Sequence, residues 1–400
     1  MLKRRSGFDH LPESYLFPEV QRRKEEFLAA HPGVSLISLG IGDTVLPLPK
    51  VIAEAMGNAS LSMSTEEGYR GYGLEQGSPT LREQIASRFY PEMSAEEIFV
   101  TDGSKSDLAR LQAFFGSDVS IALQDPTYPV YLEGSLIQEV KNIHLLPCTK
   151  ENDFVCPLPE GIDLLYLCNP NNPTGKVMTF EELERIIEHA RKFRYLILYD
   201  GAYAGYIQDQ KFPRTIYDIP GADEVAIEVN SFSKLAGFTG IRLGWTVIPK
   251  RLSYSCGRSL WKDLQRQNSI TFNGASYLSQ VGGMAALEEE GWKGIQQSIA
   301  QTMQNAHFLK KLFQSEGFEV FGGDNAPYLW IHTPKKKGWD LFQDFLEERH
   351  LIVTPGVGFG ACGEHYFRVS AFGRPSAIHQ LKRGSDGRVS ARIMELPPRV

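Results

Sequence analysis

The chain has 400 residues, of which 42% are hydrophobic and 22% are charged. This composition is typical of a soluble globular protein, and the length predicts two domains rather than one. The formal charge is −6, whereas proteins that bind nucleic acids or anionic membranes usually carry an excess of basic residues. No apolar run approaches the roughly 20 residues that are needed to span a bilayer.

The N-terminus and the cysteines indicate a cytoplasmic protein. The first stretch, MLKRRSGFDHLPESYLF, has no apolar segment after its basic residues, which argues against a secretory signal. The cysteines form no CxxC pair, so we expect reduced thiols at Cys148, Cys156, Cys168, Cys256 and Cys362. The histidines form no HExxH or HxH motif, and we therefore expect no metal site.

The first clear pattern in chain order is EEIFVTDGSKSDLARLQAFF, residues 96–115. It predicts a strand, a tight turn at Gly103 and a helix that begins near Ser104. A second unit starts with the apolar run IDLLYLC, followed by NPNNPTG and a helix opened by a capping box of Thr179 and Glu182. One face of that helix carries Leu183, Ile186, Ile187 and Ala190.

The stretch RYLILYDGAY, residues 194–203, continues this second unit. Its apolar run predicts a strand buried on both faces, as in a parallel sheet. Strand, helix and strand in this order form a βαβ unit. After residue 280 the pattern changes to longer helical segments and then to the strands of APYLWIHT, HLIVTPGVGFG and YFRVSAFG. We expect a smaller α+β domain there, joined to the rest by a long helix around 276–315.

Polar side chains follow the predicted strands at their carboxyl ends, where open α/β sheets bind ligands. These residues are Ser104, Lys105, Tyr128, Asn172, Asp200, Tyr203, Ser231, Ser233 and Lys234. The set suits an aldehyde cofactor that carries a phosphate and a basic ring nitrogen. A lysine condenses with the aldehyde, a carboxylate keeps the ring nitrogen protonated, and hydroxyls with a helix N-terminus bind the phosphate.

Four motifs in order, NPNNPTG, YDGAY, SFSKLAGFTGIRLGW and YFRVS, resemble the fold-type I pyridoxal-phosphate enzymes of the aspartate aminotransferase superfamily. The resemblance covers roughly residues 15–375. Within that superfamily, SYLFPEVQRR, LGIGDTVLPLP, GYRGYGLEQGSPTLR and QDPTYPVYL are similar to the branch that acts on LL-2,6-diaminopimelate. The resemblance implies pyridoxal 5′-phosphate (PLP) as cofactor and a homodimer whose active sites are shared across the interface.

The same resemblance implies the fold. We expect a large α/β domain with a mixed, mostly parallel sheet flanked by helices, and a smaller α+β domain. The expected boundaries are an N-terminal arm with part of the small domain at 1–43, the large PLP-binding domain at 44–285 and the small C-terminal domain at 286–400.

Residue roles carried over from the family concern first the cofactor. Lys234 would form the Schiff base and shuttle the proton at the substrate Cα. Asp200 would pair with the ring nitrogen, Asn172 and Tyr203 would bind the ring oxygen, and Tyr128 would stack on the ring. The phosphate would be held by Ser104, Ser231, Ser233 and Arg242, with Lys105 beside the phosphate or the substrate.

Other roles concern the substrate and the second subunit. Arg368 would clamp the α-carboxylate with its planar fork, while Tyr15 and Gly42 would line the substrate with Lys105, Tyr128 and Asn172. Tyr72 and Asn273 would reach the partner's site, Tyr72 at the phosphate. Glu75, also supplied across the dimer, is a candidate partner for the distal ammonium of diaminopimelate, and an exposed turn glutamate is the alternative.

The resemblance implies a ping-pong transamination. It interconverts LL-2,6-diaminopimelate plus 2-oxoglutarate with tetrahydrodipicolinate plus glutamate, and it serves the synthesis of lysine and peptidoglycan precursors. A broader aminotransferase or a PLP-dependent β-lyase is the alternative, since the same cofactor supports several reactions. The run from Ser231 to Lys234 also fits the S-x-x-K motif of acyl-transferring enzymes, but their S-D-N and K-T-G motifs are missing. A non-catalytic sensor domain would be expected to carry a basic DNA-binding appendage, which the sequence lacks.

The sequence departs from the family at its C-terminus. There the family continues an amphipathic helix, whereas GSDGRVSARIMELPPRV interrupts it with glycines and ends on prolines. The last twenty residues therefore lie outside the resemblance.

Overall fold

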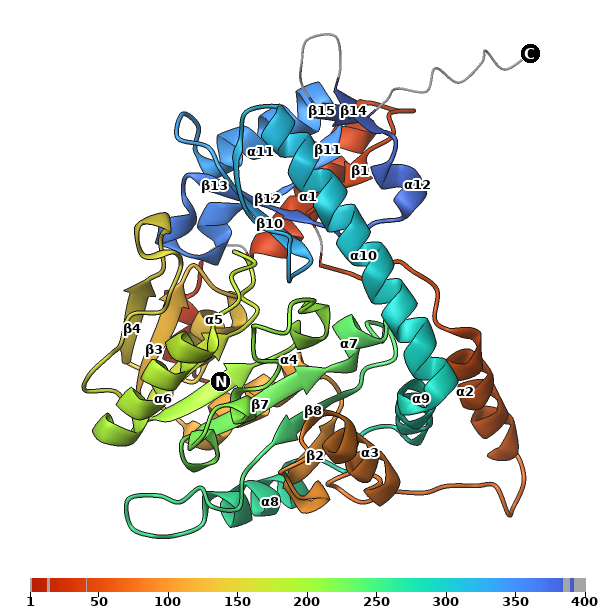
Figure 1. The fold of residues 1–400 in the computed structure, drawn as a ribbon, viewed down its shortest axis with the longest axis vertical. Helices are drawn as coiled ribbons and strands as arrows, with labels where there is room; N and C mark the ends of the chain where they lie inside the picture. Colours follow the sequence, from red (N-terminus) through yellow and green to blue (C-terminus); the bar gives the residue numbers. More distant parts are fainter. Residues whose placement is uncertain (1, 13–14, 41, 384–388, 392–400) are drawn as a thin grey trace.

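The computed structural model describes residues 2–12, 15–40, 42–383 and 389–391. Its centre is a seven-stranded sheet in the order β2–β8–β7–β6–β5–β3–β4 (Figure 1). The strands are β2 (Ile98–Thr101), β3 (Ser120–Asp125), β4 (Asn142–Pro147), β5 (Leu164–Cys168), β6 (Leu196–Asp200), β7 (Ala226–Ser231) and β8 (Gly244–Val247). All neighbours pair in parallel except β8, which is antiparallel to β2 and β7. The expected mixed, mostly parallel sheet is confirmed.

Helix α6 (Phe180–Phe193) shows how the sequence determines the connections between strands. The Thr179 side chain accepts from the backbone of Glu182, and the Glu182 carboxylate accepts from the backbone of Thr179, so both ends of the predicted capping box are formed. The helix buries the four predicted apolar residues, Leu183, Ile186, Ile187 and Ala190. It connects β5 to the parallel strand β6, which confirms the βαβ unit.

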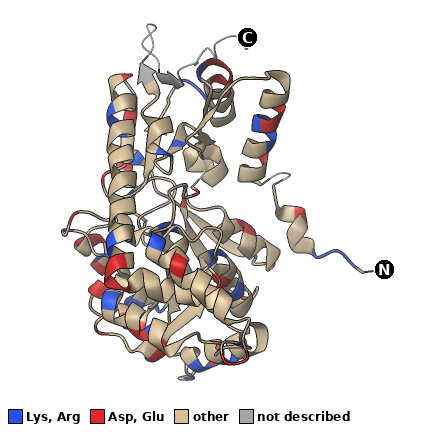
Figure 2. Ribbon diagram, turned by 90° about the vertical axis from the view of Figure 1, so that its right-hand side faces the viewer, with Lys and Arg blue, Asp and Glu red and all other residues tan. Residues whose placement is uncertain are grey.

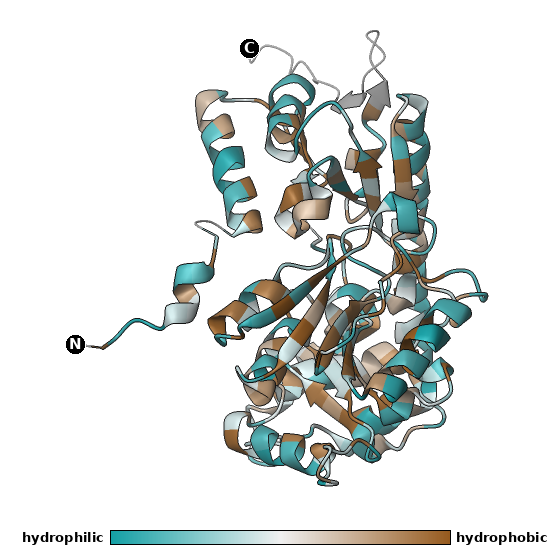
Figure 3. Cartoon of the chain, turned by 90° about the vertical axis from the view of Figure 1, so that its left-hand side faces the viewer, coloured by the Kyte–Doolittle hydropathy of each residue, from teal (hydrophilic) through white to brown (hydrophobic). Residues whose placement is uncertain are grey.

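Apolar side chains fill the space on both faces of the large sheet, and the strands are coloured mostly as hydrophobic in Figure 3. Along β5, Leu165 and Leu167 belong to one cluster, while Leu164, Tyr166 and Cys168 belong to the other, as the period of two in a strand requires. The helices in this part are α2 (Lys50–Ser62), α3 (Pro79–Phe89), α4 (Ser104–Phe115), α5 (Val130–Ile137), α6, α7 (Phe232–Leu235), α8 (Leu260–Thr271) and α9 (Tyr277–Leu287).

A smaller unit lies above the large sheet in Figure 1. Its four-stranded antiparallel sheet has the order β12 (Thr354–Pro355), β13 (Tyr366–Ser370), β10 (Tyr328–His332) and β9 (Glu319–Gly322). Strand β1 (Ile37–Ser38) pairs in parallel with β11 (Leu351–Ile352), so the N-terminal segment joins this unit. The accompanying helices are α1 (Leu16–Ala30), α11 (Gly338–Arg349) and α12 (Pro375–Ile378).

Helix α10 (Glu289–Ser315) runs from α2 and α9 beside the large sheet up to the smaller unit (Figure 1). The expectation of a single long helix around 276–315 is wrong in one respect, because the helix is interrupted between α9 and α10. Glu288 adopts an extended conformation with φ −69° and ψ 163°, which ends one helix and starts the next at a new angle.

The two ends of the chain differ. The N-terminal segment runs outward from α1 (Figures 2 and 3), and Ser6 there donates a 2.6 Å hydrogen bond to Glu139. At the other end, β14 (Leu381–Arg383) pairs with β15 (Val389–Ala391). The expected departure at the C-terminus otherwise falls on 384–388 and 392–400, outside the described residues. Within the described part of the chain, no helix is long and apolar enough to cross a membrane.

Candidate active site

An open cavity lies at the carboxyl ends of the parallel strands, with about 1110 Å³ of empty space when the solvent at its mouth is included. Its lining contains twelve of the residues singled out from the sequence: Gly42, Ser104, Lys105, Tyr128, Asn172, Asp200, Tyr203, Ser231, Ser233, Lys234, Arg242 and Arg368. These residues come from segments up to 326 positions apart, the separation between Gly42 and Arg368. The structure therefore brings most of the expected site into one cavity.

Lys234 follows β7 directly and lies in the short helix α7, which is capped by the Ser231 side chain. Its Nζ is partly buried and donates a hydrogen bond to the backbone oxygen of Gly42. Burial lowers the pKa of Lys234 to about 8, the carboxylate of Asp43 opposes that shift, and the cation of Arg368 adds to it. About a tenth of this amine is therefore neutral and nucleophilic at pH 7, far more than for a lysine with the ordinary pKa.

One end of the cavity is a cradle for an anion. Gly103, with φ +110°, precedes α4, and a Cβ there would lie 2.5 Å from the guanidinium of Arg242. Arg242 donates a 3.0 Å hydrogen bond to the Ser233 hydroxyl. The first backbone N–H groups of α4, the serine hydroxyls and Arg242 thus converge, and this donor set fits a phosphate dianion.

Asp200 lies at the end of β6 and is 5% exposed. Its Oδ2 accepts a 2.6 Å hydrogen bond from Tyr131, and its Oδ1 accepts one of 3.0 Å from the backbone of Ala202. Burial raises the pKa of Asp200, while these two donors oppose the shift. Tyr131 was not foreseen, because in the sequence it reads as an ordinary core residue of α5.

Arg368 occupies the middle of β13 and is 1% exposed. Its Nη1 donates a 2.7 Å hydrogen bond to Asn172, and its Nη2 donates one of 2.5 Å to the backbone oxygen of Gly40. Among the residues that the structure describes, no carboxylate lies within ion-pair distance of this guanidinium. A buried cation without a counterion is costly, so the site is built to receive an anion from a ligand.

Arg368 and Asp200 are both buried charges without an opposite charge in contact among the described residues, and both line the same cavity. Lys234 lies in that lining as well. A ligand with a phosphate, a protonated ring nitrogen and an aldehyde would complement the cradle, the carboxylate and the amine in turn. The residues present therefore fit PLP, with Arg368 left for the carboxylate of an amino acid.

Tyr203 and Tyr328 are joined by a hydrogen bond that the sequence did not indicate. Their hydroxyl oxygens are 2.7 Å apart, and Tyr328 lies on β10 of the smaller unit. The guanidinium of Arg368 lies 4.3 Å from the centre of the Tyr328 ring. Tyr328, a residue of the other sheet, thus contacts both Tyr203 and Arg368.

Four expected site residues do not line this cavity. The ring of Tyr15 lies 5.3 Å from the Nζ of Lys105, at the cavity's edge. Tyr72 is 90% exposed on the segment between α2 and α3, and Glu75 and Asn273 are exposed too. A Cβ on Gly274 would lie 2.6 Å from the backbone oxygen of Leu74, so the segments that carry Tyr72, Glu75 and Asn273 touch one another. They lie on one exposed face, outside the lining of this cavity.

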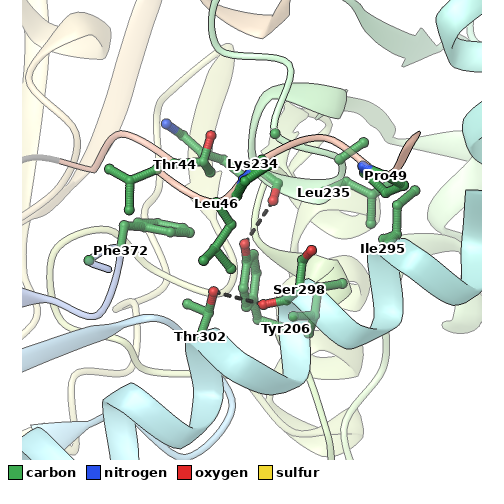
Figure 4. Close-up of a pocket in the computed structure, with 16 residues that line it drawn as sticks. Thr44, Leu46, Pro49, Tyr206, Lys234, Leu235, Ile295, Ser298, Thr302 and Phe372 are labelled. Carbon is green, nitrogen blue, oxygen red and sulfur yellow. Dashed lines mark hydrogen bonds between the residues drawn. The ribbon is translucent and has the colours of Figure 1, made fainter. Parts of the chain in front are cut away.

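A second, much narrower cavity also has Lys234 in its lining (Figure 4). Its walls are mainly apolar and include Leu46, Ile295 and Phe372. The Tyr206 hydroxyl donates a 2.7 Å hydrogen bond to the backbone oxygen of Lys234 there. Lys234 is the one charged residue among the described residues that line this second cavity.

Lys and Arg positions are interspersed with Asp and Glu positions along the ribbon in the view of Figure 2. In the described ranges, no group of three or more histidine, cysteine, aspartate or glutamate residues is arranged to hold a metal ion.

Comparisons with known proteins agree with this geometry. Residues 34–381 match the family model of aminotransferase class I and II. The chain is 46% identical to an LL-diaminopimelate aminotransferase of Protochlamydia amoebophila, over 94% of this chain and 95% of that protein. It is also 46% identical to the chloroplastic LL-diaminopimelate aminotransferase of Arabidopsis thaliana, over 96% and 86%. The solved L,L-diaminopimelate aminotransferase of Chlamydomonas reinhardtii superposes with a TM-score of 0.91 at 46% identity, over 94% and 96% of the two chains.

Proposed function

Because the chain belongs to the class I and II aminotransferases, we propose that it transfers an amino group between LL-2,6-diaminopimelate and 2-oxoglutarate with PLP as cofactor. The products are glutamate and a keto acid that cyclises to tetrahydrodipicolinate, and the reverse direction serves lysine synthesis. The names of relatives at 46% identity over nearly the whole chain support the substrate. The cofactor is supported by the donor set of the cavity.

One observation carries the proposal. A partly buried lysine with a pKa of about 8 shares a cavity with a buried arginine that has no carboxylate partner in the described chain. This combination suits an amino acid, whose amine and carboxylate are bound by different groups. When bound, PLP supplies an aldehyde that captures the amino group and a ring that delocalises the electron pair left on Cα.

The chain's own residues supply binding and proton transfer. Arg368 holds the α-carboxylate with its fork, which fixes the orientation of Cα relative to Lys234. The neutral amine of Lys234 removes the proton from Cα, and the ammonium group that results donates the proton again later in the reaction. Asp200 keeps the ring nitrogen protonated, and Asn172 and Tyr203 bind the ring oxygen. The Gly103–Arg242 cradle, with Ser104, Ser231 and Ser233, anchors the phosphate.

The active enzyme is proposed to be a homodimer. Tyr72 is almost fully exposed and lies with Glu75 and Asn273 on one face. Nearby Leu61, Tyr69, Leu74 and Ile270 are exposed hydrophobic residues, which supports burial of this face against a second copy. Each subunit would then supply Tyr72 and Asn273 to its partner's cavity, and Glu75 to the distal ammonium of the substrate.

The test is a spectroscopic half-reaction. Purified protein loaded with PLP is titrated with LL-diaminopimelate in the absence of a keto acid. We expect the yellow absorption band to decrease while the band of pyridoxamine phosphate grows, and 2-oxoglutarate to reverse the change. A yellow protein that ignores diaminopimelate but responds to another amino acid would refute the substrate and keep the reaction class.

The matched control is Lys234→Ala. This variant should bind PLP through the phosphate cradle but show no conversion of the spectrum. Normal turnover by Lys234→Ala would overturn the assignment of the lysine.

A further inference from the structure

We propose that Tyr328 is a positioning residue that couples the carboxylate-binding Arg368 to Tyr203, the residue expected at the ring oxygen of the cofactor. The inference rests on the proposed function and adds to it a link between the two sheets. Tyr328 is the first residue of β10, where it pairs with Ser370 of the neighbouring strand β13, and Arg368 lies two residues earlier on β13.

Three contacts make Tyr328 a link. Its hydroxyl lies 2.7 Å from that of Tyr203, and the two rings meet edge to face with centres 5.0 Å apart. The Arg368 guanidinium lies 4.3 Å from the centre of its ring, within the range of a cation–π interaction. A Cβ on residue 42 would lie 2.2 Å from the same hydroxyl, which explains why glycine is needed there. The oxygen of that glycine accepts from Lys234.

The direction of the Tyr203–Tyr328 hydrogen bond follows from the role of Tyr203. If Tyr203 donates its proton to a ligand oxygen in the cavity, its own oxygen must accept from Tyr328. Tyr328 is 1% exposed, and its hydroxyl has no other hydrogen-bond partner among the described residues. The chain of donors therefore runs from Tyr328 to Tyr203 to the ligand, and each bond strengthens the next.

This chain responds to the charge of Arg368. Burial raises the pKa of Tyr328, and the cation of Arg368 opposes that shift, so the cation makes the hydroxyl a better donor. The other titratable groups near Tyr328 are Tyr203, Cys168, Tyr128 and Tyr206, all of them neutral acids, because burial raises the pKa of each. When a substrate carboxylate neutralises Arg368, Tyr328 becomes a weaker donor, and so does Tyr203. Occupancy of the carboxylate site is thereby sensed at the ring oxygen.

The test is Tyr328→Phe, which keeps the ring over Arg368 and removes only the hydroxyl. The readout is the pH midpoint of the absorption change of bound PLP, measured with and without glutarate, a dicarboxylate that lacks an amino group. A hydrogen-bond donor to the ring oxygen lowers the pKa of the Lys234 nitrogen when PLP is bound to it, because the oxygen then holds the proton of that nitrogen less strongly. A weaker donor therefore raises the pH midpoint. We expect the midpoint of the variant to rise by roughly half to one pH unit, and the additional shift caused by glutarate to shrink.

The control is Tyr217→Phe, which removes a tyrosine hydroxyl that donates to the backbone oxygens of Ala226 and Val247 outside the cavity. Its midpoint and its response to glutarate should equal those of the unmodified protein. Unchanged values in Tyr328→Phe would overturn the coupling. A protein that forms no coloured complex with PLP even when unmodified would instead refute the proposed function, so the two failures are distinguishable.

Discussion

Tyr131 donates a 2.6 Å hydrogen bond to Asp200 from a ring that is itself fully enclosed. The bond joins the first turn of α5 to the end of β6 and gives the buried carboxylate one of its two donors. It is therefore one of the two contacts that oppose the upward shift that burial gives to the pKa of Asp200.

Tyr131→Phe should raise the pKa of Asp200 further and weaken its hold on a protonated ring nitrogen. A hydrogen bond to a charged group contributes about 1.5–3 kcal/mol, so we expect kcat to fall roughly 10-fold or more. Steady-state kinetics and PLP titration measure the effect. Tyr166→Phe is the control, because Tyr166 stacks on Tyr131 at 5.5 Å but does not line the cavity. Equal effects of the two variants would mean that packing alone matters.

Capture of PLP by the cofactor-free protein should depend on pH through Lys234. Its pKa of about 8 predicts that the capture rate rises from pH 6 to pH 9 with a midpoint near 8, because only the neutral amine attacks. Asp43→Asn should move this midpoint to lower pH, since the Asp43 carboxylate raises the pKa of Lys234. Stopped-flow absorbance follows the rate, and Glu92→Gln, an exposed carboxylate outside the cavity, should leave the midpoint in place. An upward shift in Asp43→Asn would contradict the electrostatic sign.

Arg368→Lys should keep the charge and lose the planar fork that donates to Asn172 and Gly40. We expect the KM for diaminopimelate and for glutamate to rise together, roughly 10- to 100-fold, because both substrates present the same α-carboxylate. PLP affinity should remain within about twofold, as the phosphate cradle is untouched. A KM effect confined to one substrate would place Arg368 at the distal end of the ligand instead.

Glu228 on β7 should be important for stability rather than for chemistry. Its carboxylate accepts four hydrogen bonds, from Tyr90, Asn230, Thr215 and the backbone of Ile216. The Tyr90 oxygen already accepts from Trp245 and Asn230, so its proton must point to Glu228. Glu228→Gln would place an amide N–H against these donors, and we expect the free energy of unfolding to fall by about 1–3 kcal/mol. Urea unfolding measures this, and an unchanged midpoint would show that the network can reorient.

Sharing of the active site can be tested with mixed subunits. Tyr72→Ala and Lys234→Ala should each be impaired as homodimers. A hybrid of the two has one site with both defects and one with neither, so random mixing should restore about a quarter of full activity. Lys234→Ala mixed with Arg368→Ala is the control, because both residues act in their own chain's cavity and no intact site can form. Recovery in the control, or none in the test pair, would contradict exchange of Tyr72.

The parts of the fold that were predictable from sequence are those with local causes. The capping box of α6 lies within four residues, and Asp200 is recognisable because a polar residue follows an apolar strand. Tyr131 and Tyr328 were missed because their partners are 69 and 125 residues away, and a buried tyrosine looks the same in sequence whether or not its hydroxyl has a task. The break at Glu288 was missed because helical periodicity resumes directly after it. The site residues Tyr72, Glu75 and Asn273 stay predictions, because their expected partner is a second chain.

Arg368 donates one hydrogen bond to Asn172 and one to the backbone oxygen of Gly40, and these two bonds fix the plane of its guanidinium. The Nε of Arg368 has no hydrogen-bond partner among the described residues, and each Nη keeps a second N–H, so an incoming carboxylate finds free donors. The guanidinium is thus oriented before a ligand arrives, so binding does not have to spend free energy on ordering the arginine side chain.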